Sequence, residues 1–228
     1  MTQSVQPALP ANVNRGGVNQ GGANQSGGDR VGVDRGKEAV KSALIAAACE
    51  LLADVGPKNM SVRNVAQKAG VNHGQVHHYF GGKQGLVEEA MQQLSEQHFR
   101  NARARSAGAT LPEPLTLGED DQYSRAMVRL ILDGDLETAL REISQGVSIP
   151  HEAVKAIVSR FDGQVPIEVQ AVMAVNIATE LGWAALEPYI FEMVEVEDAD
   201  QEEVRAHAKV ISRRHLNEIL ENSTPHSS

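Results

Sequence analysis

The chain has 228 residues, a net charge of −9 and 41% hydrophobic residues, enough apolar material for one domain or two small ones. Its one cysteine, Cys49, excludes a disulfide framework, a thiolate zinc cluster and a Cys-x-x-Cys redox pair. The longest apolar run, residues 43–49, is far shorter than the roughly 20 residues that span a bilayer. With no secretory signal pattern at its start, the chain is expected to be cytoplasmic, without a membrane partner.

The charge is divided unevenly along the sequence. Residues 1–108 carry 12 Lys and Arg against 8 Asp and Glu, whereas residues 109–228 carry 9 against 22. No acidic residue lies between Asp54 and Glu88, a window that holds four Lys or Arg and three His. A basic window in an acidic protein indicates a local surface for a polyanion.

The two ends of the chain differ from the rest in composition. Residues 1–35 contain seven glycines and only scattered apolar residues, so we expect a disordered tail, and a second short tail at 223–228. Arg30, Arg35 and Lys37 lead into the first helix. They belong either to a tail without a role in binding or to a basic arm that enters the minor groove of DNA.

The first folded region, residues 36–85, is predicted to contain three helices. Apolar residues at three- and four-residue steps predict a helix over 37–55, which Gly56 and Pro57 end. Ser61 is a candidate N-cap for a short helix that ends near residue 69, and Asn72 for another over 73–79.

The second region, residues 86–222, is predicted to be a helical bundle. A long helix is expected over 83–105, then a loop over 106–118 and helices near 120–132, 135–145, 150–161, 166–190 and 199–221, with glycine and proline between them. Sustained two-residue alternation is absent from the sequence. The fold class is therefore expected to be all-α, with roughly nine helices.

Residues 62–81 fit the frame of a helix-turn-helix. The frame needs inward apolar or small residues at fixed offsets and a turn residue that tolerates positive φ. These positions are occupied by Val65, Ala66, Gly70, Val71 and Val76. A helical hairpin with a glycine turn and no DNA-binding role is the alternative interpretation.

The run from Ser61 to Leu86, SVRNVAQKAGVNHGQVHHYFGGKQGL, resembles the DNA-binding domain of the tetracycline-repressor (TetR) family. The resemblance implies a three-helix DNA-binding domain, followed by a helical domain that binds a small-molecule effector and forms the homodimer. The chain departs from the family pattern at Asn72, where the family usually has Ser, and at His77, where it usually has Tyr.

The second helix of the frame would enter the major groove and read base edges. With Val76 and Phe80 facing inward, the residues left for DNA are His73, Gly74, Gln75, His77 and His78. The resemblance adds Arg63 as a base or phosphate contact, and Ser61, Tyr79 and Lys83 as phosphate contacts.

His73 and His77 are four residues apart on one helical face, a spacing that also suits two metal ligands. No acidic or cysteine ligand lies in the neighbouring window, so we expect no metal and no cofactor. Cys49 lies on an apolar helix and is expected to be an inert core residue rather than a redox sensor.

In the second region, polar residues inside the apolar helix 166–190 are candidate effector contacts: Asn176, Thr179 and Glu180, with Trp183 one turn further. The resemblance implies that this helix and helix 199–221 form a four-helix bundle with a second copy. Packing of both helices within one chain is the alternative.

We therefore interpret the sequence as a dimeric, sequence-specific transcriptional regulator that binds a palindromic operator in double-stranded DNA, most plainly a repressor released by a small molecule. A helical interaction or ligand-binding module without DNA binding is the alternative. A helical enzyme is a further one, but the sequence shows no set of nucleophile, base and acid.

Overall fold

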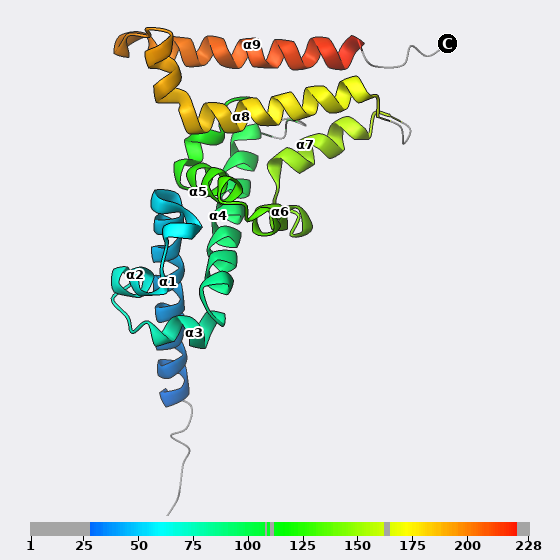
Figure 1. Ribbon diagram of the computed structural model, residues 1–228. Coiled ribbons are helices and arrows are strands. Elements are labelled where there is room, and N and C mark those ends of the chain that lie inside the picture. The colour runs from blue at the N-terminus through cyan, green and yellow to red at the C-terminus, as the bar shows by residue number, and fades with distance from the viewer. Residues whose placement is uncertain (1–27, 108, 110–111, 162–164, 223–228) are drawn as a thin grey trace, which may run out of the picture. The chain divides into compact units, whose positions relative to one another are not determined.

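The computed structural model describes residues 28–107, 109, 112–161 and 165–222, and every regular element in them is a helix (Figure 1). The predicted all-α class is therefore confirmed for these residues. The chain divides into two compact units at Lys37. In the first unit, the described residues 28–37 are helical.

The helices follow the predicted order. They are α1 (Gly28–Asn59), α2 (Val62–Lys68), α3 (Gly74–Phe80), α4 (Lys83–Ser106), α5 (Asp121–Leu132), α6 (Leu136–Ser144), α7 (Ile149–Val158), α8 (Ile167–Met193) and α9 (Gln201–Asn222), with short 3₁₀ helices η1 (Leu117–Asp120) and η2 (Asp198–Asp200). Predicted ends differ from these by four residues or fewer, except at the start of α1.

Helix α1 starts at Gly28, nine residues before the predicted start at residue 37. Residues 28–35 of the expected tail are therefore helical. Extending an existing helix by a few residues costs far less than nucleating a new one, which favours this longer helix. The remaining parts of both expected tails, residues 1–27 and 223–228, lie outside the described residues. At the other end, Gly56 leaves the helical conformation (φ 76°, ψ 168°), as the Gly56-Pro57 pair predicts.

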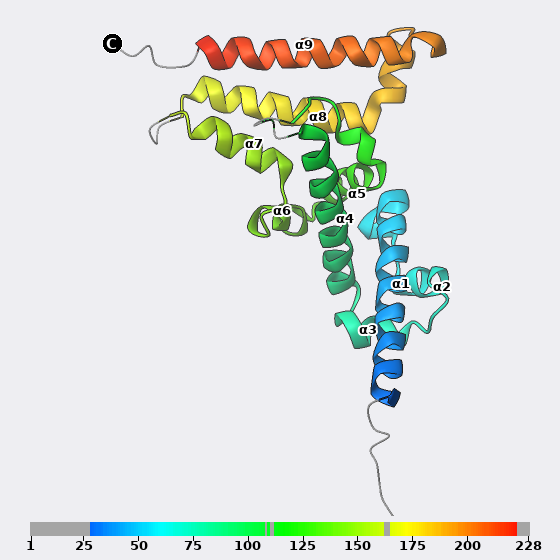
Figure 2. The ribbon, with the colours of Figure 1, turned by 180° about the vertical axis from the view of Figure 1, so that it is seen from behind.

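The largest apolar core joins the first region to the start of the second. It takes buried side chains from α1 to α6, including Leu44, Leu52, Val76 and Leu130. Helix α4 extends from α3 toward α8 in both views (Figures 1 and 2). A displacement along α4 therefore reaches the residues beside α3 without crossing a flexible linker.

Helices α8 and α9 are less completely packed. They lie side by side in both views (Figures 1 and 2), and a small core of Ile157, Phe161 and Val169 joins α7 to α8. Many of their large apolar side chains nevertheless remain exposed. By length and composition alone, helix α8 is also long and apolar enough to cross a membrane.

Candidate nucleic-acid interface and effector groove

The turn between α2 and α3 has the geometry that the sequence predicts. The Ser61 hydroxyl oxygen accepts a hydrogen bond from Asn64 N at 3.1 Å and caps α2. Gly70 has φ +68°, a conformation that costs glycine little. The Asn72 side chain accepts from Gly74 N at 2.8 Å, an Asx turn directly before α3, whose N-cap residue is His73. Ser61 and Gly70 therefore play the predicted parts, whereas Asn72 precedes the cap of α3 by one residue.

The inward and outward faces of α3 also match the prediction. Val76 and Phe80 are buried, and Val65 and Ala66 of α2 are buried opposite them. The polar side chains of the same short helix remain accessible: His77 and His78 are exposed, and Gln75 and Tyr79 are half-buried. Helix α3 thus presents a row of hydrogen-bonding groups from a rigid apolar base.

The sequence did not indicate why α3 and α4 approach so closely. Gly81 and Gly82 both have positive φ, and Gly85 lies on α4 directly against the Phe80 carbonyl oxygen. A Cβ at Gly85 would overlap that backbone oxygen, and backbone cannot move aside as a flexible side chain can. Gly85 therefore fixes the position of α3 relative to α4, and only the folded backbone reveals this requirement.

The basic window is only partly available for a polyanion. Lys68 forms an ion pair with Glu50 at 2.6 Å, and Lys58 pairs with Asp133 at 3.8 Å. Arg63 is exposed and makes no ion pair in the described part of the chain. Among the described residues, Lys83 Nζ donates to the Lys58 carbonyl oxygen, at 3.5 Å. Arg63 and Lys83 are thus the two cations of the window without a carboxylate partner among these residues.

The nine predicted DNA contacts consequently lie on neighbouring elements: Ser61 and Arg63 at the start of α2; His73, Gly74, Gln75, His77, His78 and Tyr79 on or beside α3; and Lys83 at the start of α4. Gly74 leaves room at the start of α3, since the nearest neighbour of a Cβ there would be the Asn72 side chain. No group of three possible metal ligands occurs among the described residues.

Cys49 is buried in the α1 core, and its Sγ lies 3.5 Å from the Ala90 carbonyl oxygen. Burial raises the pKa of the thiol to about 12. A thiol with that pKa carries almost no thiolate at neutral pH, which agrees with the expected inert role.

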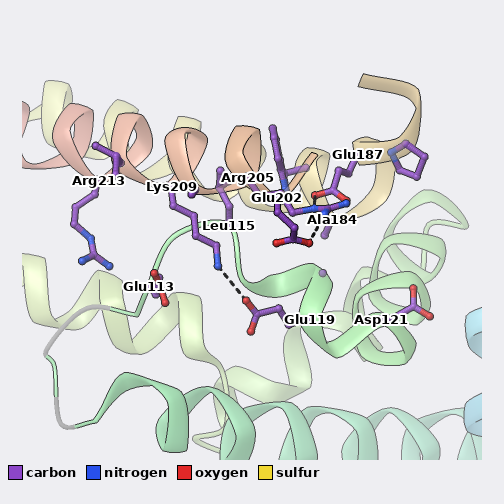
Figure 3. Close-up of a pocket in the computed structure, with 15 residues that line it drawn as sticks. Glu113, Leu115, Glu119, Asp121, Ala184, Glu187, Glu202, Arg205, Lys209 and Arg213 are labelled. Atoms are coloured by element: carbon purple, nitrogen blue, oxygen red, sulfur yellow. Dashed lines mark hydrogen bonds and ion pairs between the residues drawn. The ribbon is translucent and has the colours of Figure 1, made fainter. Parts of the chain in front are cut away.

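A groove of ≈ 730 Å³ lies between α9, α8 and the segment that precedes α5 (Figure 3). Trp183, one of the predicted effector contacts, lines it. Glu180 lies behind the wall, where its carboxylate accepts from Leu115 N at 2.7 Å and burial raises its pKa. Asn176 and Thr179 are not among the lining residues, and Thr179 donates to the Val175 carbonyl oxygen.

The charged residues that line this groove were not predicted from the sequence as effector contacts. Arg205, Lys209 and Arg213 follow one another at four-residue steps on α9 and all line the groove. Glu187 accepts two hydrogen bonds from Arg205, each 2.9 Å long, and Glu119 accepts one from Lys209 at 3.2 Å (Figure 3). The spacing was visible in the sequence, but the acids that face it come from distant segments.

A buried polar network joins α4 to η1, α5 and α6. His98 Nδ1 lies 2.7 Å from Asp120, which also accepts from Asn101 and Arg105. The Tyr123 ring stacks on His98 with centroids 4.2 Å apart, and its hydroxyl donates to Glu142 at 2.7 Å. Burial lowers the pKa of His98 despite the neighbouring carboxylates, and raises that of Tyr123.

Comparison with known proteins agrees with this geometry. Residues 44–90 match the family described as "Bacterial regulatory proteins, tetR family". An HTH-type transcriptional repressor of Mycobacterium tuberculosis is 27% identical over 170 residues, which cover 75% of this chain and 85% of that protein. The HTH-type transcriptional regulator BetI 1 of Chromohalobacter salexigens is 37% identical over 95 residues, 41% of each chain.

A solved structure extends the likeness beyond the first region. A tetR-family transcriptional regulator from Streptomyces coelicolor superimposes with a TM-score of 0.50 over 82% of this chain and 88% of that one, at 19% identity, a likeness of fold. The matched helices 44–90 contain the turn, the exposed α3 and the capped α2 described above. Residues 44–90 therefore form a DNA-binding domain of the tetR family of bacterial regulatory proteins, and the chain is a DNA-binding transcriptional regulator of helix-turn-helix type.

Proposed function

We propose that the protein is a homodimeric repressor that binds a palindromic operator and leaves it when a small molecule binds the second region. The observation that carries this proposal is the arrangement around α3, where polar side chains face outward and Arg63 and Lys83 have no carboxylate partner in the described part of the chain. The Mycobacterium tuberculosis relative is named a repressor, which supports the direction of regulation proposed here.

The DNA contacts follow from the chemistry of the exposed groups. The Gln75 amide suits a bidentate pair with adenine, and the exposed histidines suit purine acceptors in the major groove. The Ser61 hydroxyl accepts from Asn64 N through its oxygen and keeps its own hydrogen for a phosphate. Lys83 and Tyr79 would hold the sugar-phosphate backbone, which positions the protein without reading sequence.

The exposed apolar side chains of α8 and α9 support the homodimer. Leu186, Tyr189 and Met193 of α8 are between 52% and 63% exposed, and Val210 and Ile211 of α9 are similarly uncovered. A second copy related by a two-fold axis would cover the same helices on both chains. The dimer then places two copies of α3 about one DNA turn apart, as a palindrome requires.

The proposed dimer interface also accounts for the apolar composition of α8 without a membrane. In a dimer those side chains lie against protein, so we propose a cytoplasmic location despite the length of α8. A monomer in dilute buffer that partitions onto lipid vesicles would contradict this part of the proposal.

The effector is proposed to bind in the groove beside Trp183, and the signal to reach α3 along α4. Gln84 at the start of α4 donates to Thr138 at 3.0 Å, and Glu88 pairs with Arg141 of α6. A shift of α6 would therefore act on α4 next to Lys83. By linkage, an effector that weakens DNA binding by a given factor must itself bind the DNA-bound dimer more weakly by that factor.

The test is selection of bound duplexes from a randomised library, with the oligomeric state measured by light scattering. We expect enrichment of a palindrome and a dimer in solution. A duplex-binding monomer would leave DNA binding intact but contradict the dimer. Absence of any enriched sequence, at low as well as physiological salt, would favour the interaction or ligand-binding module without DNA binding.

A further inference from the structure

Two residues of α5 contact the connection between α1 and α2. Arg129 Nε donates to the Ala53 carbonyl oxygen at 2.9 Å, and Asp133 accepts from Lys58 N at 3.0 Å. Both contacts are to backbone atoms, and the two side chains lie four residues apart on one face of α5. Together they hold the last turn of α1 before Gly56 and the first turn after it.

The charges of the two contacts suit the groups that they meet. Ala53 lies in the last turn before α1 breaks at Gly56, where carbonyl groups lack helical partners and attract a cation. Lys58 follows Pro57, where the chain resumes a helical turn and its N–H groups attract an anion. Arg129 and Asp133 therefore fit the two sides of the Gly56 break, each with the favourable sign.

Asp133 itself occupies a position that its own helix disfavours. It is the C-cap residue of α5, where the helix dipole favours cations over carboxylates. Its side chain is 23% exposed and lies beside Gly56, where an added Cβ would be 3.2 Å from Asp133 Oδ2. Because Asp133 is unfavourable for α5 itself and accepts a hydrogen bond from the distant Lys58, we infer that its role lies outside α5.

The held segment in turn contacts the proposed phosphate-binding group. Lys83 Nζ donates to the carbonyl oxygen of Lys58, the same residue whose N–H donates to Asp133. The segment also leads within three residues to Ser61, the cap of α2. One carboxylate from the second region thus fixes a backbone unit against which Lys83 is oriented.

We propose that Asp133, assisted by Arg129, is a positioning residue for DNA binding, which sets residues 56–61 and through them Lys83. The inference rests on the proposed DNA contacts of the first region. It adds a connection at α1 that is independent of the α4–α6 contacts described above.

The test compares variants on the highest-affinity duplex that the wild-type protein selects from a randomised library. Asp133→Ala removes the acceptor, and we expect affinity to fall by about three- to tenfold. Asp133→Asn keeps an oxygen acceptor for Lys58 N but loses the negative charge, and with it the 3.8 Å ion pair to a side chain that is 68% exposed. Because such surface pairs contribute little, affinity should return to within about twofold of wild type.

Asp54→Ala is the matched control. Asp54 pairs with Arg125 of the same α5 at 3.1 Å, between two exposed side chains, so this variant removes a surface ion pair between α1 and α5 but keeps the Asp133 contact. This variant should bind the duplex as the wild type does. Urea unfolding of each variant, and affinity measured well below its unfolding midpoint, separate a shift in binding from a loss of folded protein.

A double-mutant cycle with Lys83→Ala tests the route. If Asp133 acts through Lys83, the double variant loses little more affinity than Lys83→Ala alone. Losses that multiply would overturn that route, and wild-type affinity in Asp133→Ala would overturn the proposal while the DNA-binding function stands. A wild-type protein that selects no duplex would instead overturn the proposed function together with this inference.

Discussion

The first region and the α8–α9 pair use apolar residues differently. Around α3 the apolar side chains are buried and the polar ones face outward, so the helix-turn-helix completes its packing within one chain. On α8 and α9, large apolar side chains such as Tyr189 and Val210 are more than 60% exposed. A region that satisfies its own packing presents a rigid surface to DNA, whereas the uncovered apolar side chains of α8 and α9 are those that the proposed dimer would bury.

The largest effect is expected at Gly85, which fixes α3 against α4. In Gly85→Ala, the new Cβ would overlap the Phe80 carbonyl oxygen, so α3 must move and the variant should lose about 1–3 kcal/mol of unfolding free energy and most DNA binding. Gly70→Asn is the control, because nothing lies within 4 Å of a Cβ there and asparagine tolerates positive φ. Equal urea midpoints for the two variants would contradict the close-approach argument.

The second prediction separates positioning from reading on the DNA side. Lys83→Ala should weaken binding to all duplexes and reduce the slope of log K against log salt by about one. Lys68→Ala should change the slope less, since Glu50 already neutralises Lys68. Gln75→Ala should instead cost about 1–3 kcal/mol at one base pair and relax the preference there. Identical sequence profiles for Gln75→Ala and wild type would remove Gln75 from base reading.

A smaller effect is expected from pH on the network beside α4. Burial lowers the pKa of His98 below its usual 6.5, so the folded chain holds the neutral ring and the unfolded chain binds the proton more readily. The unfolding free energy should therefore fall as pH drops below about 6.5 toward the folded-state pKa. His98→Gln should lack this part of the pH dependence. An unchanged slope in the variant would assign the effect to another group.

Asp120 is expected to lose its stabilising contribution at a lower pH than His98. Its pKa is lowered by hydrogen bonds from Arg105, Asn101 and His98, which together outweigh the opposing effect of burial. Its contribution to stability is present above the usual value of 3.8 and is lost as pH falls through the lower folded-state pKa. The two losses should therefore appear as separate steps in acid unfolding.

The smallest predicted effect concerns the groove. Trp183 is the single tryptophan of the sequence and lines the groove, so its fluorescence reports on this part of the α8–α9 surface. A library compound that quenches this emission and releases the selected duplex should retain its affinity for Asn176→Ala, because Asn176 does not line the groove, and should bind Lys209→Ala more weakly. Loss of binding in Asn176→Ala but not in Lys209→Ala would place the effector elsewhere.

The first region was more predictable from sequence than the second, for a physical reason. Ser61, Gly70, Asn72 and Val76 act within a few residues of their own positions, so capping, turn and periodicity rules were sufficient. The role of Gly85 was not predicted, because it depends on the distance to a backbone atom, the Phe80 carbonyl oxygen, which no sequence pattern shows. In the groove, Glu119 and Lys209 are 90 residues apart, and no local rule brings such residues together. Asn176 and Thr179 were predicted as effector contacts but do not line this groove.

Footprinting of the wild-type protein on its selected duplex tests the central claim most directly, because it shows how many copies of α3 read the DNA and where. The account predicts two protected half-sites, related by a two-fold axis and about one helical turn apart, with two chains bound. Protection of a single asymmetric half-site by one chain would contradict it.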